Sequence, residues 1–142
     1  MGWDTITDAP KFSDCVKDLS VEAKIIEVYD GDTVKAIFPL NGSLYKWNCR
    51  LTDIDTPEIR TKSKIEKAYG YKVRDFLKEK ILNKVVTLQC GKLDKYGRLL
   101  VSIYYNNESN SINQWLINNN YAFEYNGGTK KSWEKYLLNN SI

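Results

Sequence analysis

The stretch "AKIIEVYDGDTVKAIFPLNGSLYKWNCRLTDI", residues 23–54, carries the strongest fold signal in the chain. β-branched and apolar residues predict three strands here, at 23–29, 33–38 and 44–54. The first turn is "DGD" and the second is "PLNGS", whose Asn-Gly pair is the strongest hairpin cue. Strands joined by turns this short indicate an antiparallel meander.

The spacing of apolar residues changes after the meander. A helical stripe runs over positions 65–81. Because Gly70 weakens it, the expected helix begins either near Ile65 or only after Gly70. The polar turn "KLDKYGR" lies between two further expected strands, at 84–90 and 99–105. Two short amphipathic helices are expected at 111–119 and 130–140.

Five strands with a helix after the third predict an α+β, mainly β fold: a five-stranded Greek-key barrel with about three helices. That is the oligonucleotide-binding (OB) architecture. Residues 1–22 show no clean periodicity and are interpreted as an N-terminal arm, and residues 23–142 as the folded domain.

Composition excludes several classes of protein. The chain has 142 residues, enough for one domain with a real core, and a net charge of +3. This charge permits a polyanionic partner without requiring one. The absence of histidine excludes a Ser-His-Asp triad, a Cys-His dyad and the usual zinc hydrolase sites.

Other features bear on location. Three widely spaced cysteines are typical of free thiols in a reducing compartment. No apolar run reaches the ~18 residues of a membrane span, and the first residues do not resemble a secretory signal. The expectation is an intracellular monomer that does not bind membranes. Richness in Asn and Lys is typical of an AT-rich microbial or viral genome.

Two short segments concentrate acidic residues. "DGD" places Asp30 and Asp32 together, and "DIDTPE" places Asp53, Asp55 and Glu58 together. Turn chemistry alone would explain either segment. In a meander, however, the turn at the start of the second strand lies near the end of the third, so the two segments should meet. Like charges held together repel by about 1 kcal/mol per pair even in water, and a divalent cation would offset this repulsion.

Two arginines extend the pattern. Arg50 lies near the end of the third expected strand, and Arg98 opens the fifth. Each alone is interpreted as an ordinary strand or turn residue. Beside a carboxylate-held cation, two guanidinium groups are suited to bind phosphate oxygens. Glu58 is then available to orient or deprotonate an attacking water.

"DGDTV", an Arg near the end of the next strand, "DTPE" and "DKYGR", in this order, resemble the staphylococcal nuclease-like (thermonuclease) family over residues 23–125. The resemblance implies an OB barrel with added helices. It also implies calcium-dependent hydrolysis of single-stranded DNA and RNA that leaves 3′-phosphates.

The resemblance also implies a metal site. Asp32 and Asp55 match the family's metal-binding aspartates, and the carbonyl of Thr56 matches its backbone ligand. Asp30 matches an acid just outside the metal's first shell. Glu58 matches the proposed general base.

Substrate contacts are implied in the same way. Arg50 and Arg98 match the phosphate-binding arginines, with Arg98 towards the leaving group. Further substrate-binding matches are Lys95 and Tyr96 for the 3′ phosphate, Leu100 and Leu51 for a wall beneath a base, and Tyr125, with a shift of one residue, for base stacking.

Two alternatives stay open. A non-catalytic module that binds nucleic acid or protein would be expected to have lost some of these residues, whereas Asp32, Arg50, Asp55, Glu58 and Arg98 are all present. A calcium-stabilised structural protein would explain the acids but not the arginines. The lysines of "RTKSKIEK" are typical of a solvated loop, which could steer nucleic acid.

Overall fold

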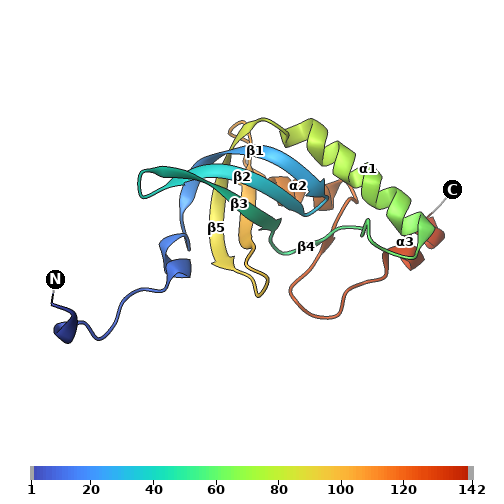
Figure 1. Cartoon of the computed structure of the whole chain (residues 1–142). Helices are drawn as coiled ribbons and strands as arrows, with labels where there is room; N and C mark the ends of the chain where they lie inside the picture. Colours follow the sequence, from blue (N-terminus) through green and yellow to red (C-terminus); the bar gives the residue numbers. More distant parts are fainter. Residues whose placement is uncertain (1, 141–142) are drawn as a thin grey trace.

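The computed structural model describes residues 2–140 and shows a closed β-barrel flanked by helices (Figure 1). The strands are β1 Ser20–Asp30, β2 Thr33–Leu40, β3 Ser43–Leu51, β4 Ile54–Asp55, β5 Val85–Leu93, β6 Leu99–Tyr104 and β7 Phe123–Glu124. The helices are α1 Lys64–Ile81, α2 Ile112–Asn118 and α3 Trp133–Asn140, after short 3-10 turns at Trp3–Thr5 and Phe12–Cys15.

The barrel has the strand order β1-β2-β3-β6-β5. Its only parallel pair in the described chain is β3 with β6, where Arg50 lies opposite Leu100. Strands β4 and β7 form a separate two-stranded ribbon that pairs Asp55 with Phe123. The predicted OB-type barrel with three helices is therefore confirmed.

Alternating burial explains why these segments form strands. In β6, Leu99, Val101 and Ile103 point into the core. In β2 the same period buries Val34, Ala36 and Phe38. A period of two residues places one apolar face of each strand inside the barrel.

Helix α1 lies alongside the barrel (Figure 1) and begins at Lys64, so the alternative start after Gly70 is wrong. The Ser63 side chain caps it by accepting a hydrogen bond from the Glu66 N–H. Gly70 is buried, and there is no room for a side chain at this position. A Cβ there would lie 2.9 Å from the carbonyl oxygen of Glu58. The close approach of α1 to the Glu58 backbone, rather than helix propensity, explains why this position is a glycine.

The third strand was predicted to continue to Ile54 but ends at Leu51. Asp53 adopts a left-handed conformation with φ 63° and turns the chain, so that Ile54 and Asp55 pair with β7. This turn moves Asp55 away from the barrel wall and towards the helices.

The first strand begins at Ser20, three residues earlier than expected, and pairs there with Gln89. Just before it, Val16 is fully buried and the Asp18 N–H donates to the Cys90 carbonyl. Residue 1 of the expected arm and residues 141–142 of the expected domain lie outside the described residues. Across residues 2–140, no helix combines the length and apolar character that crossing a membrane requires.

Candidate active site

The two acidic segments meet at one end of the barrel, as the sequence predicts. Gly31 packs so closely that a Cβ there would lie 2.9 Å from the Cβ of Thr56 and 2.8 Å from Cγ1 of Val73 in α1. The N–H of Leu51 donates to the Asp32 carbonyl at 2.8 Å. The turn containing Gly31 and the segment containing Thr56 are thus in direct contact.

Asp32 is held by side chains on both of its carboxylate oxygens. The Thr33 hydroxyl donates to Oδ1 at 3.1 Å, and Nη2 of Arg50 lies 3.4 Å from Oδ2. Its backbone N–H donates to Oδ1 of Asp30. Burial, together with the negative charge of Asp32, raises the pKa of Asp30 to about 7.

Asp55 is the most deeply buried acid of the site, at 3% exposure. Its Oδ1 atom is buried without a hydrogen-bond donor. Nζ of Lys130 lies 3.4 Å from this atom, close enough for an ion pair but not in hydrogen-bonding geometry. Burial raises the pKa of Asp55, while the charge of Lys130 opposes the rise.

Glu58 is exposed, and α1 fixes the segment that carries it. Its backbone N–H donates to Oε2 of Glu66 at 2.8 Å, and its carbonyl lies against Gly70. Desolvation and the charge of Asp32 both raise the pKa of the Glu58 carboxyl. A carboxylate with a raised pKa is a stronger base, which is the property that general-base catalysis needs.

Arg50 is anchored in the barrel, opposite Thr33 of β2. Nη1 donates to the Leu51 carbonyl at 2.6 Å, and Nη2 donates to the Ile54 carbonyl at 2.9 Å. These two bonds fix the plane of the guanidinium group beside Asp32. They leave other N–H groups of Arg50 to bind an anion.

Arg98 lies two residues before Leu100, the residue that pairs with Arg50, but its own contacts are local. Its Nε donates to Oδ2 of Asp94 at 2.8 Å. Asp94 also accepts the backbone N–H groups of Tyr96 and Arg98, and these bonds lower its pKa against the opposing effect of desolvation. The structure thus ties Arg98 to its turn rather than to the acidic segments.

The predicted substrate-binding residues fall into two groups. Tyr96 is 72% exposed, with Nζ of Lys95 5.2 Å from its ring centre, so this pair lies open to a ligand. Leu51 is fully buried in the core, which corrects the expectation that it forms part of a wall beneath a base. Leu100 is half-buried in β6.

Tyr125 lies beside the acidic segments. Its backbone N–H donates to the Asp53 carbonyl, and its ring lies 5.4 Å from Nζ of Lys130. It lines a cavity of about 530 Å³ together with Asp53 and Asp55. Its hydroxyl donates to the carbonyl of Gly128.

The donor set fits a hard cation that takes only part of its coordination from the protein. Within residues 2–140, no three His, Cys, Asp or Glu side chains group closely enough to hold a metal by themselves. Two aspartates and a carbonyl would leave positions for water and substrate. The Oδ1 atom of Asp55 is buried and accepts no hydrogen bond, and the negative charge of Asp32 contributes to the raised pKa of Asp30, so a positive charge between the segments would be favourable.

Sequence reasoning missed two residues of the site and one residue that bonds α2 to the barrel. Lys130 contacts Asp55 from a loop that has no motif. Ser63 and Glu66 form a capping pattern that is visible in the sequence. The carboxylate of Glu66, however, accepts a hydrogen bond from the backbone N–H of Glu58. Asn113, buried in α2, donates to the Thr52 and Val101 carbonyls, and an amide in an apolar helical stripe was the only signal for it.

Comparison with known proteins agrees with the barrel fold and identifies a family. Residues 48–140 match the family of staphylococcal nuclease homologues. Uncharacterized protein MJ1439 of Methanocaldococcus jannaschii is 36% identical over an alignment of 124 residues, and the match covers 72% of this chain and 58% of the relative.

Two further relatives have names that state an activity. The thermonuclease of Staphylococcus hyicus is 34% identical over 87 residues, covering 60% of this chain and 49% of that protein. An uncharacterized endonuclease of Escherichia coli O157:H7 is 29% identical over 105 residues, covering 74% of this chain and 61% of that protein. The chain thus spans between 49% and 61% of these relatives' lengths.

The fold and the family match place this protein in the class of nuclease-type OB barrels. The chain belongs to the staphylococcal nuclease family.

Proposed function

We propose that this protein is a calcium-dependent nuclease that hydrolyses single-stranded DNA and RNA and leaves 3′-phosphates. The observation that carries the proposal is the meeting of Asp32, Asp55 and Glu58 beside a fixed Arg50. Relatives named thermonuclease and endonuclease support a nucleic-acid substrate.

The proposed cation site uses the acidic segments. The carboxylates of Asp32 and Asp55 and the carbonyl of Thr56 would hold calcium, with Asp30 outside the first shell. Calcium, when bound there, supplies Lewis-acid polarisation of a phosphate oxygen. Asp30 keeps the Asp32 backbone in place through its hydrogen bond to the Asp32 N–H.

The two arginines bind the scissile phosphate. Arg50 presents N–H groups from a guanidinium plane already fixed by two carbonyls. Arg98 reaches the phosphate from the neighbouring turn, on the side of the leaving group. Preorganised donors of this kind stabilise negative charge as it builds on the phosphoryl oxygens.

Glu58 acts as the base. It takes a proton from a water molecule whose oxygen forms a bond to phosphorus, and the bond from phosphorus to the 5′ oxygen breaks. The 5′ oxygen leaves and is protonated as a hydroxyl, and the phosphate stays on the 3′ side. The raised pKa of Glu58 suits this proton transfer.

Aromatic and cationic groups beside the site position the nucleic-acid strand. Lys95 and Tyr96 hold the neighbouring 3′ phosphate, and Tyr125 offers a face to a base. Stacking on such a face contributes about 1–3 kcal/mol per base.

The test is cleavage of a single-stranded oligonucleotide with calcium, with magnesium and with EGTA. We expect turnover with calcium, none with EGTA, and products whose ends a phosphatase can dephosphorylate. Glu58→Gln should reduce the rate by about 10²–10⁴-fold. Glu22→Gln, an exposed acid on β1, is the matched control and should leave the rate unchanged.

Two results would overturn the proposal. Cleavage that persists in EGTA would exclude the cation's role. Absence of cleavage with every ion, while the oligonucleotide still binds, would identify the chain as a non-catalytic nucleic-acid binding module.

A further inference from the structure

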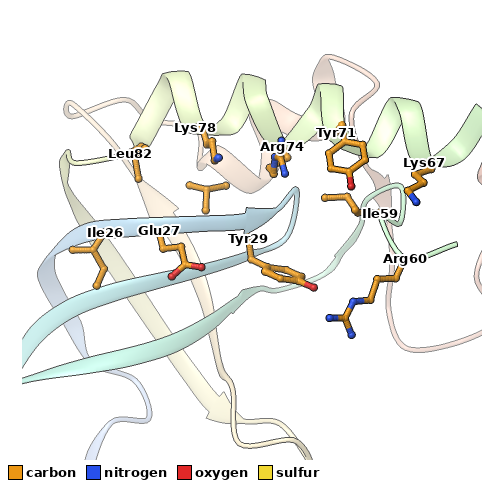
Figure 2. A pocket seen from close by; sticks show the side chains of 11 residues that line it. Ile26, Glu27, Tyr29, Ile59, Arg60, Lys67, Tyr71, Arg74, Lys78 and Leu82 are labelled. Carbon is orange, nitrogen blue, oxygen red and sulfur yellow. The ribbon is translucent and has the colours of Figure 1, made fainter.

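A second cavity lies outside the acidic site, between β1, α1 and the segment after Glu58. It has a volume of about 540 Å³. Figure 2 shows side chains from all three segments around it. Its polar lining includes four cations and two tyrosines: Arg60, Lys67, Arg74, Lys78, Tyr29 and Tyr71.

The helical part of this lining is a continuous row. Lys67, Tyr71, Arg74 and Lys78 follow one another at spacings of four, three and four residues, which places them on one face of α1. Figure 2 shows them in that order along the helix. Eleven residues of helix rise by roughly 16 Å, so the row is long enough to follow an extended strand.

The side chains that line this groove carry a net charge of +3, which equals the net charge of the whole chain. The four cations of the groove face a single acid, Glu27. The chain has 21 basic and 18 acidic residues. Without the four cations and Glu27 of the groove, 17 basic and 17 acidic residues are left. The charges of the rest of the chain therefore sum to zero.

Most of this charge is not neutralised within the described residues. Glu27 pairs at 3.4 Å with Lys35, which lies outside the groove lining. Arg74 pairs with Asp75 and lies 4.7 Å over the ring of Tyr71. The other three cations, Arg60, Lys67 and Lys78, form no ion pair within residues 2–140.

Two groove residues are close neighbours of the acidic segments in the sequence. Tyr29 directly precedes Asp30, and Arg60 follows Glu58 by two residues. Tyr29 is 47% exposed, and its ring makes no aromatic or cation–π contact within the described residues. It therefore offers an open face for a stacked base.

We propose that this groove binds a stretch of the single-stranded substrate outside the active site, with phosphates on the cations and a base on Tyr29. The inference rests on the proposed function, since it assigns the groove to that nuclease's own substrate. A cationic row with an aromatic face is the arrangement that binds single strands without reading their sequence.

The test is binding of a fluorescein-labelled 20-mer oligothymidylate, measured by anisotropy in EGTA at 50 and 200 mM NaCl. The variant Lys67→Gln/Lys78→Gln removes two cations of the row. Because each lost phosphate contact lowers the salt exponent by about 0.7, raising the salt should weaken wild-type binding about sevenfold more than variant binding.

The matched control is Lys17→Gln/Lys46→Gln, which removes the same charge from exposed lysines outside the groove. It should retain the wild-type affinity and salt dependence. Equal losses in the two variants would show only a long-range effect of charge and would overturn the proposal.

Tyr29→Leu separates a nucleic-acid groove from a general polyanion site. It should weaken oligonucleotide binding at least fivefold and leave both the salt dependence and heparin binding unchanged. An unchanged oligonucleotide affinity would contradict the proposed stacking of a base on Tyr29.

These results can be read apart from those of the cleavage assay. If wild-type protein cleaves but the groove variant binds as wild type does, the groove is wrong and the nuclease stands. If nothing is cleaved but the groove variant binds more weakly, the groove stands and the nuclease is wrong. If wild-type protein does not bind the oligonucleotide, the groove is overturned.

Discussion

Arg50 and Arg98 are predicted to bind the same phosphate, yet the fold holds them by different means. Arg50 bonds to the carbonyls of Leu51 and Ile54, at the point where the barrel wall gives way to the β4–β7 ribbon. Its side chain is 13% exposed. Arg98 bonds to Asp94 within its own turn and is 30% exposed.

The difference shows two ways of positioning a cation. The position of Arg50 depends on the global fold, and the fold in turn depends on Arg50 to satisfy two carbonyls. The position of Arg98 depends on a local turn that would form around Asp94 in any case. The three predictions that follow test this contrast and the helix-supported acidic site, from the largest expected effect to the smallest.

Replacing each arginine by lysine tests the contrast directly. Loss of a preorganised donor should lower the cleavage rate by about 10²–10³-fold in both Arg50→Lys and Arg98→Lys. Only Arg50→Lys should also lower the free energy of unfolding markedly, by about 1–3 kcal/mol, because it leaves partly buried carbonyls unpaired. Arg98→Lys keeps the charge and only weakens a partly buried pair within one turn, so it should cost under about 1 kcal/mol. Rate assays and urea denaturation measure the two effects, and equal stability losses would abolish the distinction.

Gly70→Ala tests whether α1 sets the position of Glu58. Helix propensity alone favours alanine by about 1 kcal/mol. The added Cβ, however, would meet the Glu58 carbonyl at 2.9 Å and the Pro57 carbonyl at 3.0 Å. We expect a rate loss of up to about 10²-fold from misplacement and a loss of about 1–3 kcal/mol in the free energy of unfolding.

Ala68→Gly, an exposed position in the same helix, is the control for Gly70→Ala. It should cost about 1 kcal/mol and leave the rate unchanged. A Gly70→Ala protein that is more stable than wild type and equally active would show that the close approach has no consequence.

The acidic site should make stability depend on pH. The pKa of Asp30 is raised from 3.8 to about 7 in the folded protein, so between these values the folded state binds more protons than the unfolded state. Stability in EGTA should therefore fall as pH rises from about 4 to about 7. Differential scanning calorimetry should show this fall in Tm, and added calcium should reverse it at pH 7.

Asp30→Asn should flatten this dependence, because the amide does not titrate. Asp8→Asn, in the exposed N-terminal segment, should leave the curve as in wild type. A wild-type Tm that rises over the same pH range would contradict the assigned direction.

The meander, the turns and the meeting of the acidic segments could be predicted because their signals are local. Asn-Gly and Asp-Gly turns, and strands of period two, lie within a few residues of one another. The approach of Asp32 to Asp55 then follows from meander geometry. The turn at Asp53 was missed because an Asp in the left-handed region resembles any other strand-end residue.

The remaining features depend on partners far away in the sequence. Gly70 looked like a weak point in a helix because its contact, the Glu58 carbonyl, is visible only in three dimensions. Lys130 lies 75 positions from Asp55, and no pattern connects them. The cationic row on α1 resembles an ordinary solvated helix face until Tyr29 and Arg60 are placed opposite it.

The parallel pairing of β3 with β6 has a consequence for how the protein is made. Cys49 pairs with Leu99, so the barrel wall beside Arg50 is completed only by residues translated 50 positions later. The hairpins that carry Asp32 and Arg50 are formed by residues close in the sequence and can pair before β6 is translated. At ordinary translation speeds of 5–20 residues per second, the interval is a few seconds. A nascent chain thus exposes its acidic segments before Arg98 exists, and under the proposed mechanism it cannot cleave RNA near the ribosome until the barrel has closed.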